Sequence, residues 1–139
     1  MFRRVLVPVD FSEKCKRSVI VATDIAGHYD GEIHLLHVIE TLVDTDFSEL
    51  KDFYEKLERK AEKEMKKLLA SCVSTQAAIY EKIIFGNRSR EILDYAEQRE
   101  VGLIIMTSHV VDPAQPLSSW GTISYKVALL SKCPVMLVK

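Results

Sequence analysis

The chain has 139 residues, of which 47% are hydrophobic and 28% are charged. These proportions are typical of one globular domain, and they exclude the low hydrophobicity and high net charge of a disordered chain. The 19 basic and 20 acidic residues nearly cancel, so the net charge of −1 creates no field that would attract nucleic acid or an anionic membrane. We therefore expect residues 1–139 to form a single domain with neither of these partners.

The first residues, Met1 to Asp10, contain too short an apolar stretch for a signal peptide. No run in the chain approaches the ~18 residues of a membrane span, so we expect a cytoplasmic protein. The three cysteines, Cys15, Cys72 and Cys133, are widely separated and form no C-x-x-C pair. This spacing predicts neither a disulfide framework nor a zinc site, and we interpret them as core or edge residues.

The first half of the chain begins with a short apolar run at 5–9, which predicts a strand buried on both faces. Ser12 is the expected N-cap of a helix that ends near Gly27. A second strand is predicted at 33–39. A long helix follows at 50–72, where apolar residues recur at three-four spacing and alternating Glu and Lys predict a solvated outer face.

In the second half, a third strand is predicted at 76–85, and Gly86-Asn87 forms a turn before a helix that carries Ile92. The continuous apolar run within 101–107 predicts a fourth buried strand. A polar stretch with two prolines then leads to Gly121-Thr122, where a helix is expected to begin and to extend to Leu130. The last strand is predicted at 134–138.

Strands and helices that alternate throughout predict right-handed βαβ crossovers. The expected fold is α/β, an open five-stranded parallel sheet in the order 3-2-1-4-5 with helices on both faces. In such sheets, ligands bind outside the carboxyl ends of the strands, where the order of the strands reverses. The switch point lies between strands one and four, which directs attention to Asp10, Val38 and Met106.

Several separated segments resemble the universal stress protein family, in the right order and over essentially the whole chain. They are VLVPVDFSE at 5–13, HLLHV at 34–38, GNRSREILDYA at 86–96, LIIM at 103–106, GT at 121–122 and CPVMLV at 133–138. The resemblance implies a Rossmann-like fold of the adenine nucleotide alpha hydrolase type. It also implies a homodimer paired through the last strand, Pro134 to Lys139, and membership of one of two branches, of which only one binds ATP or a related adenine nucleotide.

The nucleotide-binding branch has a glycine-rich loop after the fourth strand, and this chain departs from it. Thr107 and Val110 stand at the two glycine positions, and ten residues instead of nine separate Val110 from Gly121. A β-branched residue rarely adopts the positive φ that glycine permits. Pro113 and Pro116 also remove two backbone N–H donors from a loop that would bind phosphate through such donors.

The resemblance nevertheless implies a set of candidate ligand-binding residues at the carboxyl ends of the strands. Asp10 corresponds to the family acid that contacts the nucleoside, and Val9 and Val38 to apolar positions beside the base. The candidate ligand is ATP or AMP, with Mg²⁺ accompanying ATP. The predicted binding residues are Pro8, Val9, Asp10, Val38, Met106, Thr107, Ser108, His109, Gly121 and Thr122.

Some of these residues, and some of their neighbours, also have a purely structural interpretation. Asp10 can accept hydrogen bonds from backbone N–H groups at the start of the first helix, and Thr122 can be simply the cap of the last helix. Trp120 either covers apolar surface or stacks on a base or a partner chain. His34 and His37 are interpreted as strand residues with satisfied nitrogens, and together with His28 they have no companion set at metal-ligand spacing, so no metal site is predicted.

Other functions of similar folds fit the sequence poorly. The third strand ends in Ile84-Phe85-Gly86 without the phosphoacceptor Asp of a receiver domain, and neither a G-x-G-x-x-G nor a P-loop motif follows the first strand. Flavodoxin-like electron transfer remains open on fold alone. Ser108-His109 suggests a nucleophile and base, but no G-x-S-x-G elbow is present, so no catalytic residue is assigned.

Two hypotheses of different classes remain. In the first, the protein is a stress-response regulatory domain that binds an adenine nucleotide with an altered phosphate loop and signals to an unknown downstream protein. In the second, it is a dimeric interaction protein that binds no nucleotide. Slow ATP hydrolysis is a third and lesser hypothesis.

Overall fold

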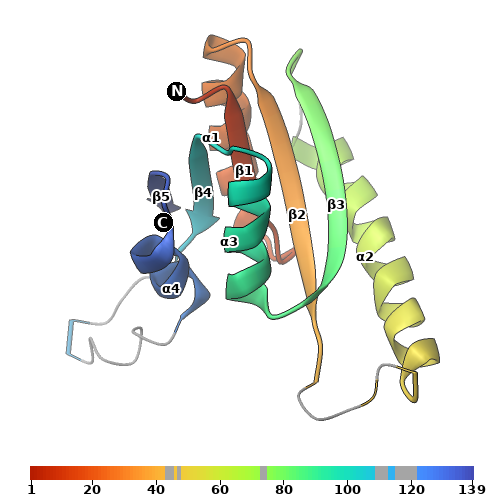
Figure 1. Cartoon of the computed structure of the whole chain (residues 1–139). Coiled ribbons are helices and arrows are strands. Elements are labelled where there is room, and N and C mark those ends of the chain that lie inside the picture. The colour runs from red at the N-terminus through yellow and green to blue at the C-terminus, as the bar shows by residue number, and fades with distance from the viewer. Residues whose placement is uncertain (43–45, 47, 73–74, 109–112, 115–121) are drawn as a thin grey trace.

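Strands and helices alternate along the chain in the computed structural model, which describes residues 1–42, 46, 48–72, 75–108, 113–114 and 122–139 (Figure 1). The elements are β1 (Arg4–Pro8), α1 (Cys15–His28), β2 (Glu32–Glu40), α2 (Lys51–Cys72), β3 (Ala78–Gly86), α3 (Arg88–Gln98), β4 (Leu103–Thr107), α4 (Ile123–Leu130) and β5 (Val135–Val138).

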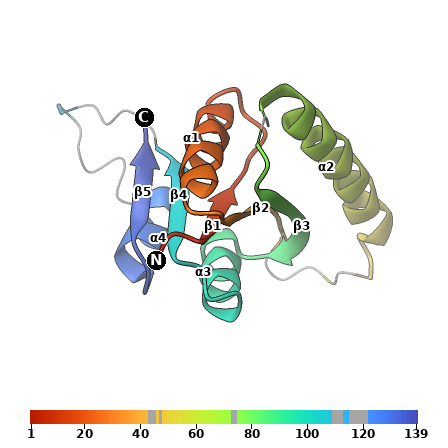
Figure 2. The ribbon, with the colours of Figure 1, turned by 90° about the horizontal axis from the view of Figure 1, so that it is seen from above.

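The five strands form one parallel sheet in the order β3-β2-β1-β4-β5, which confirms the predicted topology. Strand β1 lies in the middle, and the order of the strands reverses between β1 and β4. Figure 2 shows α1 and α2 on one face of the sheet and α3 and α4 on the other. Because the strands are parallel, the carboxyl ends of β1, β2 and β4 lie at the same end of the sheet.

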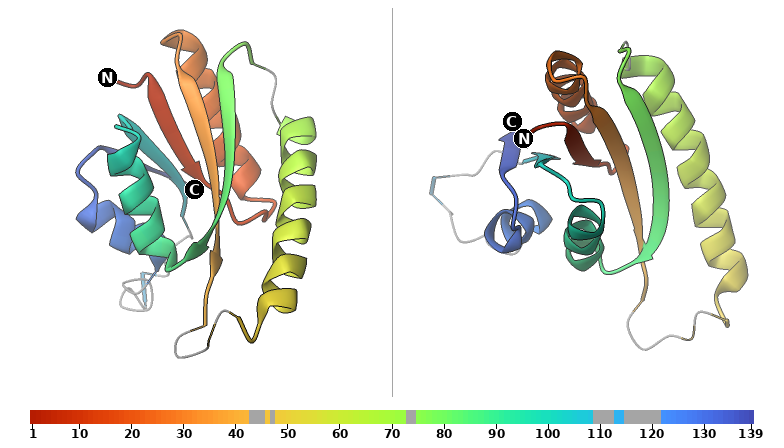
Figure 3. Two further views of the ribbon diagram at one scale, coloured as in Figure 1. Left: turned by 45° about the vertical axis from the view of Figure 1, so that its right-hand side comes forward. Right: turned by 45° about the horizontal axis from the view of Figure 1, so that its top comes forward.

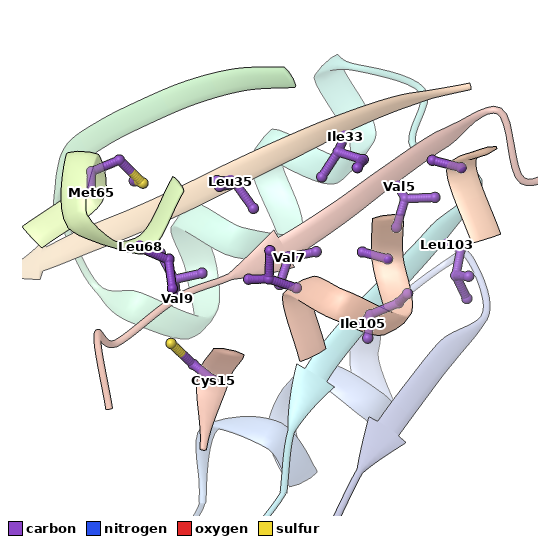
Figure 4. Close-up of a cluster of buried hydrophobic side chains, with 13 residues drawn as sticks. Val5, Val7, Val9, Cys15, Ile33, Leu35, Met65, Leu68, Leu103 and Ile105 are labelled. Carbon is purple, nitrogen blue, oxygen red and sulfur yellow. The ribbon is translucent and has the colours of Figure 1, made fainter. Parts of the chain in front are cut away.

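The central strands are buried on both faces because side chains alternate between two hydrophobic clusters. Val5 and Val7 of β1 point toward α1 and α2, where they pack with Leu35, Ile105 and Met65 (Figure 4). Leu6 of β1 points the opposite way. It belongs to the cluster beneath α3 and α4, with Leu36, Ile104, Ile92 and Val127.

Strands β2 and β3 are longer than β1 and β4, and they extend beyond them at the carboxyl edge (Figure 3). Helix α2 runs along β3 and buries Tyr54, Ala61, Met65 and Leu68 against the sheet. Most of the remaining Lys and Glu side chains of α2 are exposed, as the charge pattern predicts. A cavity is lined by residues of α2, of the end of β2 and of the turn after β1.

The start of α1 differs from the prediction. Ser12 is not the N-cap, because the helix begins at Cys15 after Lys14, which provides no side-chain cap. The backbone N–H and the hydroxyl of Ser12 donate instead to Oδ1 of Asp10, at 2.9 and 2.7 Å. The aspartate two residues earlier thus takes up the donors of Ser12, and the turn tightens before the helix can begin.

The helix starts of the second half are capped by side chains. Asn87 accepts from the Arg90 N–H at the start of α3, and Thr122 accepts from the Tyr125 N–H at the start of α4. The three cysteines are free, with Cys15 buried and the other two half-buried. None of the described helices is long and apolar enough to cross a membrane.

Candidate functional site

A cavity of about 380 Å³ opens at the carboxyl ends of β1, β2 and β4, where the order of the strands reverses. Its volume lies within the range of roughly 300–1,000 Å³ that is usual for small-molecule sites. We call it the first cavity. Its described lining consists of Pro8, Val9, Asp10, Leu36, His37, Val38, Arg88, Ile92, Met106, Thr107, Thr122, Ile123 and Ser124.

Seven of the predicted binding residues line this cavity: Pro8, Val9, Asp10, Val38, Met106, Thr107 and Thr122. Ser108 does not line it. Its backbone N–H donates to Val138 O at 2.8 Å, and its hydroxyl accepts from Lys139 Nζ at 3.2 Å. His109 and Gly121, together with Val110, Pro116 and Trp120 of the loop, lie outside the described residues.

Asp10 is held at the mouth of β1 by backbone pairing. The Val9 N–H donates to Leu36 O at 2.9 Å, so the chain remains attached to β2 for one residue beyond Pro8. Burial disfavours the charged form of Asp10, but the hydrogen bonds from Ser12 outweigh it and lower the pKa of the carboxyl below its ordinary value. Arg88 acts in the same direction. Asp10 is therefore an ionised acceptor at neutral pH.

His37, which the sequence assigned only to a strand, also lines the cavity. Its Nδ1 lies 2.8 Å from Val9 O, and a carbonyl can only accept, so Nδ1 carries the proton and Nε2 is an acceptor when the ring is neutral. Burial lowers the pKa of His37, which favours this neutral form. The ring of Phe11 covers it, with centroids 4.4 Å apart.

Arg88 is the only Lys or Arg in the described lining of the first cavity. It is the first residue of α3, and the helix brings it to the carboxyl edge because β3 ends there. Its Nε lies 3.7 Å from a carboxylate oxygen of Glu40, and both side chains are about half exposed (46% and 50%). From the sequence, Arg88 was predicted only to follow a turn. It could have been predicted as a site residue, because helices begin at the carboxyl ends of the strands in this fold.

A second cavity, of about 580 Å³, adjoins the first on the side of α2. The two cavities share Asp10, His37, Val38 and Arg88. The rest of the second lining comes from the β1–α1 turn, the end of β2 and the middle of α2. These residues are Phe11, Ile39, Glu40, Leu57, Lys60, Ala61 and Glu64.

The other histidine predicted to be satisfied within a strand is satisfied in the structure. His34 Nδ1 lies 2.9 Å from the Tyr95 hydroxyl, and Nε2 lies 3.1 Å from a carboxylate oxygen of Glu32. Among the described residues, no group of three or more His, Cys, Asp or Glu side chains is placed to hold a metal ion. The described linings of the two cavities offer carboxylate and imidazole acceptors, hydroxyl groups, the cations Arg88 and Lys60, and apolar walls.

Comparison with known proteins identifies the family. The model of the universal stress protein family matches residues 1–139, the whole chain. The chain belongs to this family. Universal stress protein YxiE of Bacillus subtilis is 28% identical over 149 residues, and the match covers all of both chains.

Solved structures with the same fold include two ligand complexes. A universal stress protein in complex with cAMP matches with a TM-score of 0.66 and 21% identity, covering 99% of this chain and 96% of the other. The universal stress protein from Archaeoglobus fulgidus in complex with dAMP matches with a TM-score of 0.63 and 18% identity, covering both chains completely. At these identities, the likeness concerns the fold.

Proposed function

We propose that this member of the family is a stress-response regulatory domain that binds an adenine nucleotide, ATP or AMP, in the first cavity. The observation that carries the proposal is the composition of that cavity. An ionised carboxylate and a neutral imidazole acceptor stand beside apolar walls at the switch point of the sheet. A nucleoside offers the complementary groups, namely sugar hydroxyls that donate and a flat apolar base.

The walls of the cavity support this assignment. Val38 and Met106 are both buried members of the cluster beneath α3 and α4, so they form a firm apolar surface beside Asp10. The relatives in complex with cAMP and dAMP bind nucleotides of the same chemical class on the same fold. Mg²⁺ enters the proposal only with ATP, whose phosphates would bind it.

The altered loop bears on which nucleotide is bound. Without the glycine-rich donors, charge-assisted contacts of about 1.5 to 3 kcal/mol each are lost from a phosphate chain. Losing two such contacts would weaken a micromolar complex toward millimolar. We therefore propose that AMP loses less than ATP, because a monophosphate depends on fewer of these contacts.

The proposal is tested by thermal unfolding of the protein with AMP, cyclic AMP, and ATP with magnesium. A ligand present at 100 times its Kd should stabilise the folded state by about 2.7 kcal/mol. No change in Tm with any of the three at millimolar concentration would refute nucleotide binding. Guanosine monophosphate is the matched control for the base.

The alternative, a dimeric interaction protein, is favoured by a separate observation. The last helix and strand expose several large apolar side chains, including Leu129 and Leu130 at 65% and 66%. Strand β5 is an edge strand of the described sheet, and an apolar edge invites pairing with another chain. The two functions are compatible if a homodimer forms through residues 134–139.

A further inference from the structure

The loop that binds phosphate in the nucleotide-binding branch departs from the family pattern in this chain, so a bound phosphate would need other donors. The second cavity offers another place for the phosphate. Asp10 and Arg88 line both the first and the second cavity, so a nucleotide whose sugar lies at Asp10 can extend toward either. The second cavity is the larger of the two.

The guanidinium of Arg88 has N–H donors that are available to a ligand. Its contact with Glu40 is 3.7 Å long, beyond hydrogen-bond range, and exposed ion pairs of this kind contribute little. No described residue receives a hydrogen bond from its guanidinium. A guanidinium has five N–H donors in a planar fork that matches the oxygens of a phosphate. A ligand phosphate can therefore bind Arg88 without breaking a strong contact.

Lys60, from α2, supplies a second cation to the lining of the second cavity. It projects from α2 and forms no ion pair with any described residue, although Glu64 stands one helical turn away. Glu64 is engaged elsewhere, because Lys67 Nζ lies 3.3 Å from its carboxylate. Among the charged groups of this lining, Lys60 is thus the cation that the described contacts leave without a counter-ion.

The three carboxylates of the second cavity all have neighbouring donors or cations. Asp10 accepts two hydrogen bonds from Ser12, Glu40 faces Arg88, and Glu64 faces Lys67. Each carboxylate therefore has a donor or a cation beside it. The walls between these groups include the apolar side chains of Phe11, Leu57 and Ala61.

We infer that the second cavity is the phosphate subsite of this protein, in which a nucleoside monophosphate is held between the guanidinium of Arg88 and the ammonium of Lys60. This inference rests on the proposed function, since it needs the nucleoside in the first cavity. It assigns the phosphate to side chains of α2 and α3. It also accounts for how a chain with Val110 and two prolines in that loop can retain a nucleotide.

The test compares AMP with adenosine by isothermal titration of the wild-type protein, Arg88→Gln and Lys60→Gln. Wild type should bind AMP more tightly than adenosine. Each variant should weaken AMP by roughly tenfold and change the Kd of adenosine by less than about twofold. Arg90→Gln and Lys63→Gln are matched controls, because they remove the same charges from α3 and α2 at positions that line neither cavity. These controls should bind both ligands like wild type.

The outcomes separate the two claims. If adenosine and AMP bind wild type with the same Kd, the second cavity is not the phosphate subsite, although nucleotide binding still holds. The same conclusion follows if Arg88→Gln and Lys60→Gln leave the Kd of AMP unchanged while Gly121→Val raises it. If neither ligand binds wild type, the proposed function and this inference both fail. Unchanged Tm values for the two variants verify that a loss of binding is not a loss of folding.

Discussion

At the carboxyl end of β1, Asp10 combines a structural role with a position in the proposed binding site. Its Oδ1 accepts the two donors of Ser12, which is the structural interpretation of this residue, and its carboxylate also lines both cavities. The next residue, Phe11, has a φ of 63°, in the left-handed region that costs an ordinary residue about 1 to 2 kcal/mol. Strained backbone of this kind is often found at binding sites.

Asp10→Asn tests the charge of this residue, because the amide still offers Ser12 an oxygen. The pKa of Asp10 is lowered from 3.8 in the folded protein, so the ionised form stabilises the fold above pH 3.8. That contribution is lost as the pH falls through the lower pKa of the folded state. We expect the free energy of unfolding of the variant, measured in urea at several pH values, to fall less steeply than wild type below about pH 4. Parallel curves would contradict a lowered pKa.

At the scale of the elements, apolar runs determine what can be predicted from sequence. The buried strands β1 and β2 lie within one residue of their predicted ranges at each end, because few alternatives bury Leu6 or Leu35. Strand β4 ends at Thr107 as predicted but begins at Leu103, two residues later than predicted. Strand β3 begins two residues later than predicted and ends one later. It is an edge strand with exposed Glu81 and Lys82, so no buried run marks its ends.

Side chains that reach between elements escaped prediction for a different reason. Arg88 and Lys60 come from α3 and α2, and only the packing of both helices at one edge of the sheet brings them to the same cavity. The spacing of residues along the chain does not predict that Arg88 and Lys60 line the same cavity. By contrast, Val9, Asp10 and Val38 follow directly from the ends of strands, where topology alone places them.

The two capped helix starts provide a prediction at this scale. Asn87→Ala and Thr122→Ala each remove the oxygen that accepts a backbone N–H, so each should lower the free energy of unfolding by about 1 kcal/mol. Asn87→Asp and Thr122→Ser keep the acceptor and serve as controls. Chemical denaturation of the four variants would measure the difference, and equal stabilities within each pair would show that the caps contribute nothing.

For the whole molecule, the exposed apolar surface of α4 and β5 predicts self-association. Met136 lies in the edge strand and is 38% exposed. A lysine at this position would place a charge in the pairing surface, so Met136→Lys should shift a dimer to monomer in sedimentation velocity. Ile20→Lys is the control, since Ile20 is also exposed but lies on α1. A wild-type protein that is monomeric at every concentration would refute the dimer.

The last strand is also joined to the residue that follows β4. The Ser108 N–H donates to Val138 O at 2.8 Å, Lys139 Nζ donates to Ser108 Oγ at 3.2 Å, and Arg17 Nη1 donates to Lys139 O at 3.0 Å. A second copy that pairs with this strand would therefore constrain the start of the segment that leads to α4 and the first cavity. Thermodynamic reciprocity then fixes the relation between the two events. By whatever factor a nucleotide changes the affinity of one copy for another, association changes the affinity for the nucleotide by the same factor.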